Sequence, residues 1–370
     1  MNFSYWELKE WFTNIDFTIV GSGIVGLNCA LELKKKHPKA TILILEKGML
    51  PQGASTKNAG FACFGSLSEL IDDLKTHSEQ EIFNLVDKRW KGLQLLRQNL
   101  GDKNIDFQQN FGYELFENEA FFEECKSQKD TINTLLKPIF KKDVFWVKPD
   151  VFGFKNVAPN HFVNIFEGQV NTGKMMHQLL LKVQQLGVKI LNNILVDSFT
   201  ETGDKVAIKT NKITFKTHKL FIATNGFANQ LLNEKIQPAR AQVLITKPIK
   251  NLHIKGTFHL DKGYYYFRNI DDRILFGGGR NLDFETEETT EFGQTTIIQN
   301  ELERILKDTI LPNTNFEIEH RWSGIMGVGS QKKAIVKPVS ENVFCGVRLG
   351  GMGVAIGSLV GKELAALLDE

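Results

Sequence analysis

The sequence has few cysteines, and their positions exclude the sites that cysteines usually build. Only four occur in 370 residues, namely Cys29, Cys63, Cys125 and Cys345. No pair shows the close C-x-x-C spacing of zinc sites, and scattered single cysteines provide no disulfide framework. We therefore expect neither a metal site nor a set of disulfide bonds.

Long apolar runs are also missing. No stretch reaches the roughly 20 apolar residues that a membrane-spanning helix needs. Residues 1–12, MNFSYWELKEWF, carry acids and lack the apolar core of a signal peptide. We expect a cytoplasmic protein without an integral membrane segment.

The chain has no marked excess of one charge sign. Its 45 Lys and Arg residues nearly balance its 43 Asp and Glu residues, which leaves a net charge of +2. So small a net charge argues against nucleic acid or an anionic membrane as the main partner. Low-complexity tracts and repeats of fixed period are absent as well. A hydrophobic content of 42% and a length of 370 residues suit a globular protein with two domains, or one large domain with an insertion.

Residues 17–46 follow the order strand, glycine turn, helix, strand, acid. The apolar run FTIV (17–20) leads into GSGIVG (21–26), and an apolar helical stripe follows. A second apolar run, TILIL (41–45), ends at Glu46. This context on both sides of a G-x-G-x-x-G motif predicts a dinucleotide-binding unit.

Each part of this unit has a physical role. Gly21 allows a sharp turn after the strand, Gly23 lets a pyrophosphate approach the backbone, and Gly26 lets the helix pack closely on the strand. The free N–H groups and the positive dipole end of the helix then face the phosphates. Glu46 stands about where a ribose-binding carboxylate belongs.

A second glycine turn lies near the C-terminus. NVFC (342–345) reads as a strand, Gly350–Gly353 as a turn and the following residues as a helix. Residues 51–66 form a small-residue loop that is long enough to indicate a function. Two helix N-termini favour a ligand that spans both, and a flavin dinucleotide fits better than a nicotinamide one. Its pyrophosphate would lie at 21–26, and its isoalloxazine ring near 350–354, where a helix N-terminus stabilises the negative charge of the reduced ring.

Taken together, these segments resemble the D-amino-acid oxidase-type (DAO) family of FAD-dependent oxidoreductases. That family includes glycine oxidase, sarcosine oxidase, D-amino-acid dehydrogenase and gamma-glutamylputrescine oxidase. The resemblance covers nearly the whole chain as separated motifs in the family's order. These are VGSGIVG (20–26), LEKG (45–48), GASTKNAG (53–60), the helix at 167–186, VDSF (196–199), IATNG (222–226), YYYFR (264–268), LFGGG (275–279), RWSGIMG (321–327) and GVRLGGMGV (346–354).

The resemblance implies an α/β fold. It consists of a Rossmann-type FAD-binding domain of the glutathione-reductase-like kind, with an inserted substrate domain built on an antiparallel or mixed sheet. We expect the discontinuous FAD-binding domain to comprise residues 1–85, 160–236 and 325–370. The substrate domain is expected to comprise residues 86–159 and 237–324.

FAD is the cofactor that the resemblance implies. Family members with covalently bound flavin carry a cysteine near residues 324–328, where this chain has none, so noncovalent FAD is expected. Carried over position by position, the expected FAD-binding residues are Gly21, Ser22, Gly23, Ile24, Val25, Gly26, Glu46, Lys47, Ser55, Thr56, Asn58, Ala59, Gly60, Val196, Thr224, Gly226, Gly351, Met352, Gly353 and Val354.

The implied reaction oxidises a C–N bond of a small amine or amino acid by hydride transfer to flavin N5. Because the cofactor itself accepts the hydride, no catalytic side chain is predicted. Tyr264, Tyr266 and Arg268 alternate along a strand-like segment, so they are expected to share a substrate-facing side. An arginine there would bind a substrate carboxylate through two parallel hydrogen bonds. A structural strand with a surface arginine is the alternative. Further substrate-binding candidates are Arg280, Lys57 and Arg348, with Arg240 and Trp322 as weaker ones, and no histidine is assigned a role.

Several alternatives stay open at this point. Met326 stands where D-amino-acid oxidase has its carboxylate-binding arginine, and residues 276–279 lack the lysine that sarcosine oxidase carries over its flavin. Oxidase and dehydrogenase therefore remain alternatives, with O2 or a quinone- or dye-like compound as electron acceptor. A flavoenzyme acting on a modified tRNA base and a non-enzymatic flavin-binding regulatory protein are the other candidate functions. The near-neutral charge counts against the tRNA enzyme.

Overall fold

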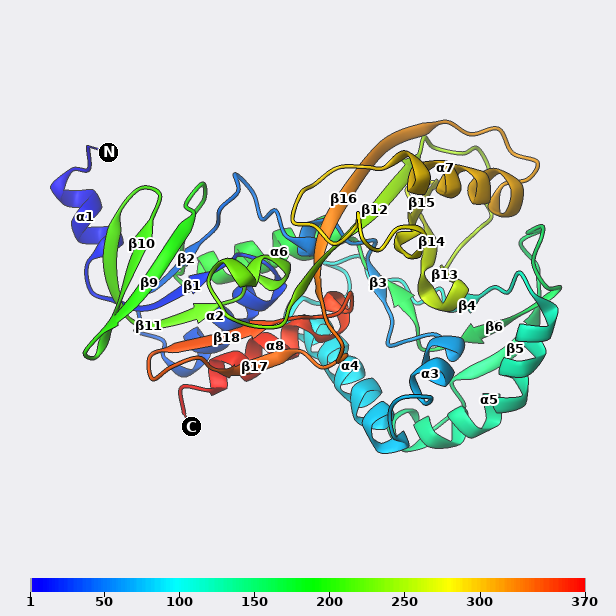
Figure 1. Cartoon of the computed structure of the whole chain (residues 1–370), viewed down its shortest axis with the longest axis horizontal. Helices are drawn as coiled ribbons and strands as arrows, with labels where there is room; N and C mark the ends of the chain where they lie inside the picture. The colour runs from blue at the N-terminus through cyan, green and yellow to red at the C-terminus, as the bar shows by residue number, and fades with distance from the viewer. Residues whose placement is uncertain (1, 370) are drawn as a thin grey trace.

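The computed structural model describes residues 2–369, and two large sheets lie next to each other in it (Figure 1). In the first sheet, the central strand β1 (Ile15–Val20) pairs in parallel with β2 (Ile42–Leu45) on one side and with β11 (Thr214–Ile222) on the other. The strand β18 (Val343–Val347) pairs in parallel with β11, so the two ends of the chain build one sheet. The remaining strands of this sheet are β8 (Lys189–Leu191), β9 (Val196–Thr202), β10 (Lys205–Thr210) and β17 (Ile335–Pro338).

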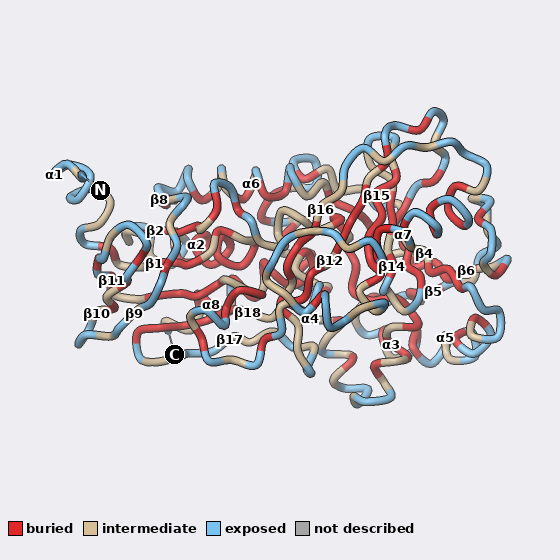
Figure 2. The backbone as a smooth tube through the Cα atoms, turned by 45° about the horizontal axis from the view of Figure 1, so that its top comes forward, coloured by how far each residue is buried: buried red, intermediate tan, exposed pale blue. Residues whose placement is uncertain are grey.

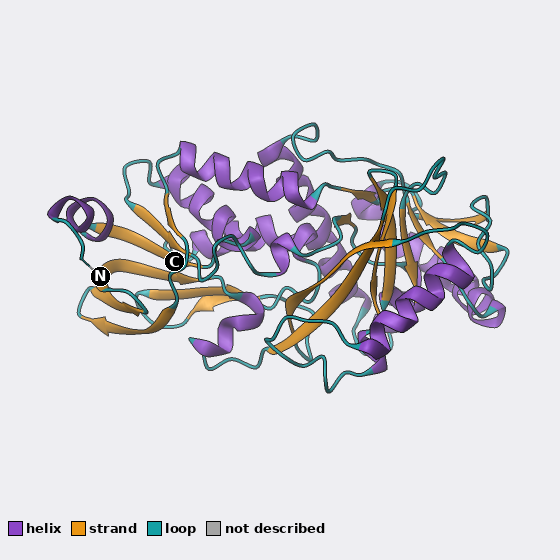
Figure 3. Ribbon diagram, turned by 90° about the horizontal axis from the view of Figure 1, so that it is seen from above, coloured by secondary structure: helices purple, strands orange, loops and turns teal. Residues whose placement is uncertain are grey.

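Helices cover one face of this sheet, as Figure 3 shows. The helix α2 (Ile24–Lys36) starts directly after the glycine turn, and its residues from Ile24 to Leu33 are buried. It packs closely on α8 (Gly353–Ala366) because Gly361 has no side chain; a Cβ there would lie 2.6 Å from the Cβ of Asn28. The other helices of this layer are α4 (Glu79–Leu100) and α6 (Thr172–Gln185).

The second sheet has eight strands in the order β16-β12-β15-β14-β13-β4-β6-β5. All neighbours are antiparallel except β13 and β4, so the sheet is mixed. The strands are β4 (Gly112–Glu114), β5 (Phe145–Pro149), β6 (Asn160–Asn164), β12 (Gln237–Thr246), β13 (Thr257–Leu260), β14 (Tyr265–Ile270), β15 (Arg273–Gly278) and β16 (Ile318–Val328).

The remaining elements flank the two sheets. The buried backbone in Figure 2 follows the strands of both sheets, whereas α1 is exposed. These elements are α1 (Tyr5–Phe12), α3 (Leu67–Asp73), α5 (Glu119–Phe140), α7 (Thr296–Ile305), the strand pair β3 (Phe61–Ala62) and β7 (Gly168–Gln169), the short helices Ala54–Thr56, Asn225–Gln230, Asp261–Gly263 and Arg280–Leu282, and the π-helical turn Leu306–Ile310. None of the helices within residues 2–369 combines the length and apolar content that a membrane crossing requires.

The α/β fold with a glycine-rich nucleotide unit and a mixed second sheet is confirmed. The domain limits stay a prediction, and two elements lie differently from the predicted assignment. The strand β6 (Asn160–Asn164), assigned to the FAD domain, pairs with β4 and β5 in the second sheet. The C-terminal half of α4, assigned to the substrate domain, packs on α8.

Candidate active site

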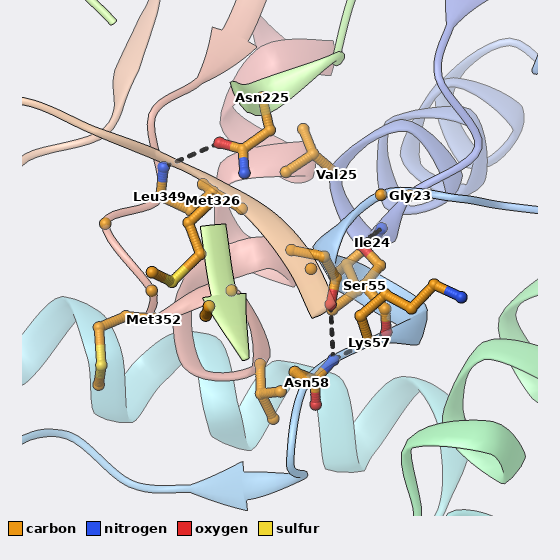
Figure 4. A pocket seen from close by; sticks show the side chains of 18 of the residues that line it. Gly23, Ile24, Val25, Ser55, Lys57, Asn58, Asn225, Met326, Leu349 and Met352 are labelled. Atoms are coloured by element: carbon orange, nitrogen blue, oxygen red, sulfur yellow. Dashed lines mark hydrogen bonds between the residues drawn. The ribbon is translucent and has the colours of Figure 1, made fainter. Parts of the chain in front are cut away.

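A cavity of about 550 Å³ lies between the two sheets. This volume is within the usual range of about 300–1,000 Å³ for ligand sites. One wall comes from the glycine turn, the 53–61 loop and residues 349–355, and the other from strands of the second sheet, with Tyr266 on β14 and Gly324 on β16. Figure 4 shows Gly23, Ser55 and Lys57 together with Met326 and Met352, which come from distant parts of the chain.

The first glycine turn is as tight as the sequence predicts. Gly21 has a φ of 103°, and a Cβ on it would lie 2.8 Å from the carbonyl oxygen of Ala223. Gly23 precedes the first residue of α2, and a Cβ there would lie 2.9 Å from the Oγ of Ser55. The backbone therefore approaches the cavity without side chains at the N-terminus of α2, which suits a phosphate group.

Glu46 is buried at the end of β2 and lines the cavity. Its Oε2 accepts hydrogen bonds from the backbone N–H of Ser22 (3.1 Å) and from the Ser22 hydroxyl (2.7 Å). Its Oε1 accepts one from the N–H of Gly48 (3.0 Å). The carboxylate thus holds the glycine turn and the end of β2 together, a role that the sequence analysis did not include.

The 53–60 loop is anchored on two helices by polar side chains. The N–H of Ile24 donates to the Oγ of Ser55 (2.9 Å), which ties the loop to the first turn of α2. The Oδ1 of Asn58 accepts from the N–H of Gly60 (2.9 Å) and from the hydroxyl of Thr172 at the start of α6 (3.0 Å). These hydrogen bonds therefore fix the backbone of the 53–60 loop along the cavity.

The C-terminal glycine turn also lines this cavity. It is held there by the side chain of Asn225, which the sequence analysis did not select. The Oδ1 of Asn225 accepts a hydrogen bond from the N–H of Leu349 (3.2 Å), as drawn in Figure 4. The N–H of Gly350 donates to the carbonyl oxygen of Gly327 (3.0 Å). Asn225 belongs to the IATNG motif, so the signal was present in the sequence.

Most predicted FAD-binding residues line the cavity. Those that do are Gly21, Gly23, Ile24, Val25, Glu46, Lys47, Ser55, Asn58, Ala59, Gly60, Val196, Thr224, Gly351, Met352, Gly353 and Val354. The other four lie behind this lining, namely Ser22, Gly26, Thr56 and Gly226. They shape the site from outside; Ser22 holds Glu46, for example, and Thr56 donates to the carbonyl oxygen of Pro51 (2.7 Å).

One buried hydroxyl of the lining fits a bound cofactor. The hydroxyl oxygen of Thr224 is buried and has no hydrogen-bond partner within residues 2–369. A buried polar atom without a partner is costly, and a polar atom of a bound cofactor would satisfy it. The ammonium group of Lys47 lies 3.3 Å over the ring of Phe227, and burial lowers the pKa of Lys47.

Four of the predicted substrate-binding residues line the cavity. Tyr266 is on β14, and burial raises its pKa to about 12, so its hydroxyl stays protonated at neutral pH. Tyr264 lies in the turn before β14. Arg280 stacks over Phe284 at 4.8 Å, and burial lowers its pKa. Over the described part of the chain, the ammonium group of Lys57 forms no ion pair.

The prediction that Arg268 faces the substrate is wrong. Arg268 does share a strand face with Tyr266, but it is 3% exposed and does not line the cavity. Its Nη1 donates to the carbonyl oxygens of Gly60 (3.0 Å) and Val170 (2.7 Å), which clamps the 53–60 loop against the segment before α6. The guanidinium group of Arg268 therefore binds backbone carbonyl oxygens of the protein and not a substrate carboxylate.

Three weaker or secondary candidates also lie outside the lining. Arg348 donates through Nη2 to the carbonyl oxygen of Lys333 (3.0 Å), and Arg240 forms a buried ion pair with Glu287. Trp322 donates through Nε1 to the carbonyl oxygen of Lys57 (2.9 Å). Each of these groups is already bound by the protein, so none is available to a substrate.

Several charged residues that the sequence analysis did not select line the cavity near α3. Lys332 lies 3.1 Å from an oxygen of Glu69 and 2.6 Å from an oxygen of Asp73. Asp72 and His259 line this part as well. These residues come from three separate segments with no shared motif, so only the folded chain brings them together.

Comparisons with known proteins agree with this architecture. The family model DAO, described as FAD dependent oxidoreductase, matches residues 16–367. The curated protein named probable oxidoreductase OrdL, from Haemophilus influenzae, is 22% identical over 95% of this chain and 82% of its own length. L-proline dehydrogenase from P. horikoshii superimposes with a TM-score of 0.78 at 20% identity, over 96% of this chain and 93% of that one. Glycine oxidase from Geobacillus kaustophilus gives 0.76 at 19% identity, over 96% and 94%. At these identities the structural likeness shows the fold.

Proposed function

Since the chain belongs to the DAO family of FAD-dependent oxidoreductases, we propose that it oxidises a C–N bond of a small amine or amino acid. The observation that carries this proposal is the cavity that both groups of segments share. The segments expected to bind FAD form one wall, and polar and cationic side chains such as Tyr266 and Arg280 line the other parts. The names of similar proteins, L-proline dehydrogenase and glycine oxidase, refer to amino-acid substrates and support the same class.

When bound, FAD supplies the acceptor for the hydride that leaves the carbon atom next to nitrogen. The side chains supply binding and orientation. The N-terminus of α2 would hold the pyrophosphate, and Glu46 the ribose. Met326, Met352 and Leu349 are apolar residues of the lining and would exclude water from a bound flavin and substrate.

Lys57 and Arg280 are the proposed partners of a substrate carboxylate. Neither cation forms an ion pair within the described residues, and both line the cavity. They would supply the positive charge that D-amino-acid oxidase takes from an arginine at the position of Met326. A cation without a protein partner favours an anionic group on the ligand, and an arginine can bind a carboxylate with two hydrogen bonds.

The edge of the cavity near α3 counts against the tRNA alternative. It carries the acids Glu69, Asp72 and Asp73 with the lysines Lys262 and Lys332, so its charge is mixed. A tRNA enzyme needs a basic open surface at this place. The mixed charge and the modest volume suit a small zwitterionic or cationic substrate.

Anaerobic reduction of the flavin tests the proposal. The holoenzyme is mixed without oxygen with glycine, N-methylglycine, L-proline, D-alanine, diamines and 2-hydroxy acids, and the visible absorbance of the flavin is followed. At least one amine or amino acid should bleach it, and rapid recovery in air would identify an oxidase. Slow recovery in air, with fast recovery on adding a quinone or dye, would identify a dehydrogenase. Bleaching by hydroxy acids alone, or by no compound, contradicts the proposal.

Two matched variants test carboxylate binding. Arg280→Met should raise the KM of a carboxylate-bearing substrate at least tenfold, since a charged hydrogen bond contributes about 1.5–3 kcal/mol. Arg348→Met removes an arginine outside the lining and should leave the KM unchanged. Equal effects of the two substitutions would exclude Arg280 as the carboxylate partner.

We expect the flavin to be held without a covalent bond. Cys63 is the cysteine that lines the cavity, and burial raises the pKa of its thiol well above the usual value, so it lacks thiolate character. Acid precipitation should therefore leave intact FAD in a yellow supernatant and a colourless pellet. A yellow pellet from the wild-type protein that becomes colourless in Cys63→Ser would show instead a covalent bond at Cys63.

A further inference from the structure

His259 and Glu167 form a buried hydrogen-bonded pair at the cavity. The Nε2 of His259 lies 2.6 Å from the Oε1 of Glu167, and their side chains are 10% and 1% exposed. The hydroxyl of Thr257 donates to the same oxygen (2.8 Å). Gly112 leaves room for this carboxylate, because a Cβ there would overlap it. Glu167 therefore has a fixed position from which it orients the imidazole.

The imidazole faces the part of the cavity that belongs to the substrate sheet. His259 on β13 lies directly opposite Tyr266 on β14, and both line the cavity. The ring of Phe61 packs edge-on against both, at centroid distances of 5.2 Å and 5.6 Å. With Nε2 engaged by Glu167, Nδ1 is the ring nitrogen that has no hydrogen-bond partner in the described chain. It is therefore free to meet a ligand.

The charges around this imidazole favour its protonated form. Burial lowers the pKa of His259, but Glu167, Glu114 on β4 and Glu69 on α3 outweigh this effect, so the pKa is raised above 6.5. The cations nearby, Arg89 and Lys332, are both neighbours of Glu69. Within residues 2–369, Glu167 has no cationic partner other than His259.

Cys63 lies beside this pair, and the donor atoms of the three residues are within 4.8 Å of one another. Two ligands of a tetrahedral zinc ion, each about 2.0–2.2 Å from the metal, are separated by about 3.3–3.5 Å. The 2.6 Å between Nε2 and Oε1 is shorter than that and is a normal length for a charge-assisted hydrogen bond. The arrangement is that of a carboxylate–imidazole pair.

We propose that His259, oriented by Glu167, accepts at Nδ1 the proton that a substrate ammonium group must lose before its C–N bond is oxidised. This step rests on the proposed amine oxidation. The N–H bond of the substrate breaks, its electron pair stays on the substrate nitrogen, and a new N–H bond forms at Nδ1. Glu167 balances the charge of the imidazolium, which later returns the proton to water. The carboxylate thus acts as a positioning residue and the imidazole as a general base.

The pH dependence of kcat/KM tests this proposal with whichever of glycine, N-methylglycine or L-proline reduces the flavin. Only neutral His259 accepts a proton, so activity should fall as the pH drops through its raised pKa, with a midpoint above 6.5. His259→Asn should remove this acid limb and lower kcat/KM by about 10²–10⁴-fold, the usual contribution of a general base. Glu167→Gln should move the limb to lower pH by a unit or more, because burial then acts on the imidazole without the carboxylate. His161→Asn removes a buried histidine of the same sheet that does not line the cavity, and it should leave the profile unchanged.

A titration that needs no substrate separates this proposal from the proposed function. In the holoenzyme with isotope-labelled histidine, the NMR signal missing from His259→Asn is assigned to His259, and its midpoint should lie above 6.5 in the wild type and lower in Glu167→Gln. If His259→Asn does not fold, the signal that moves in Glu167→Gln provides the assignment. A wild-type midpoint at or below 6.5, or an acid limb that is the same in Glu167→Gln, overturns the proposal. Failure of every amine to bleach the flavin would overturn the proposed function instead.

Discussion

Replacement of Glu46 by alanine is expected to weaken FAD binding by about 10- to 100-fold. Each hydrogen bond to a buried charged group contributes about 1.5–3 kcal/mol, and 1.4 kcal/mol corresponds to a factor of ten in affinity. The substitution removes the acceptor of the Ser22 and Gly48 N–H groups and the carboxylate proposed to bind the ribose. The measurement is the dissociation constant of FAD from the apoprotein, followed by flavin fluorescence.

Glu114→Ala is the matched control for this experiment. Glu114 is also buried and accepts hydrogen bonds from the Ser66 hydroxyl (2.7 Å) and the Ser68 N–H (3.1 Å), but it does not line the cavity. It should lower the melting temperature while the folded protein keeps its FAD affinity. Unchanged FAD affinity in Glu46→Ala, or the same loss in both variants, would remove Glu46 from the cofactor site.

Glu287→Ala should lower the free energy of unfolding by about 3–5 kcal/mol, because it leaves Arg240 as an unpaired buried charge. Arg240 donates to both oxygens of Glu287 at 2.8 Å, and Glu287 is fully buried. Gln242 donates to the same carboxylate (2.9 Å) and would lose this acceptor, keeping only the hydroxyl of Thr295 (2.8 Å). Urea unfolding at saturating FAD measures this effect.

The pair of Arg273 and Glu319 provides the comparison. Arg273 also donates through two nitrogens to Glu319, at 2.6 Å and 3.4 Å, but these side chains are 24% and 43% exposed. Solvent screens such a pair, so Glu319→Ala should lower the free energy of unfolding far less than Glu287→Ala does. Similar losses in Glu287→Ala and Glu319→Ala would show that burial does not set the strength of these ion pairs.

The nucleotide half of the site was predictable because its requirements are local. Gly21 and Gly23 are needed where a strand turns into a helix and the backbone must approach a phosphate, and such needs appear as short motifs. The small-residue loop and the second glycine turn follow the same logic. The hydrogen bonds that hold these segments, such as Asn225 to Leu349, join residues 124 positions apart and need the fold to be seen.

The substrate half was predicted less well for a physical reason. Strand alternation gives the face of a side chain but not its partner, so Arg268 was placed on the correct face with the wrong role. Glu167 and His259 are 92 residues apart and meet only because β13 and β6 both pair with β4. A contact that depends on the order of strands in a sheet leaves no motif in the sequence, so it could not be predicted.

The most direct test of the whole account is a single anaerobic turnover of the holoenzyme with the amine or amino acid that bleaches its flavin. We expect one equivalent of carbonyl product for each flavin reduced, because the imine formed hydrolyses in water. An open-chain substrate then also releases one equivalent of ammonia or amine, whereas a cyclic one such as L-proline opens its ring and keeps its nitrogen. Reduction of the flavin without a carbonyl group forming at the carbon that carried the nitrogen would contradict oxidation of a C–N bond in this cavity.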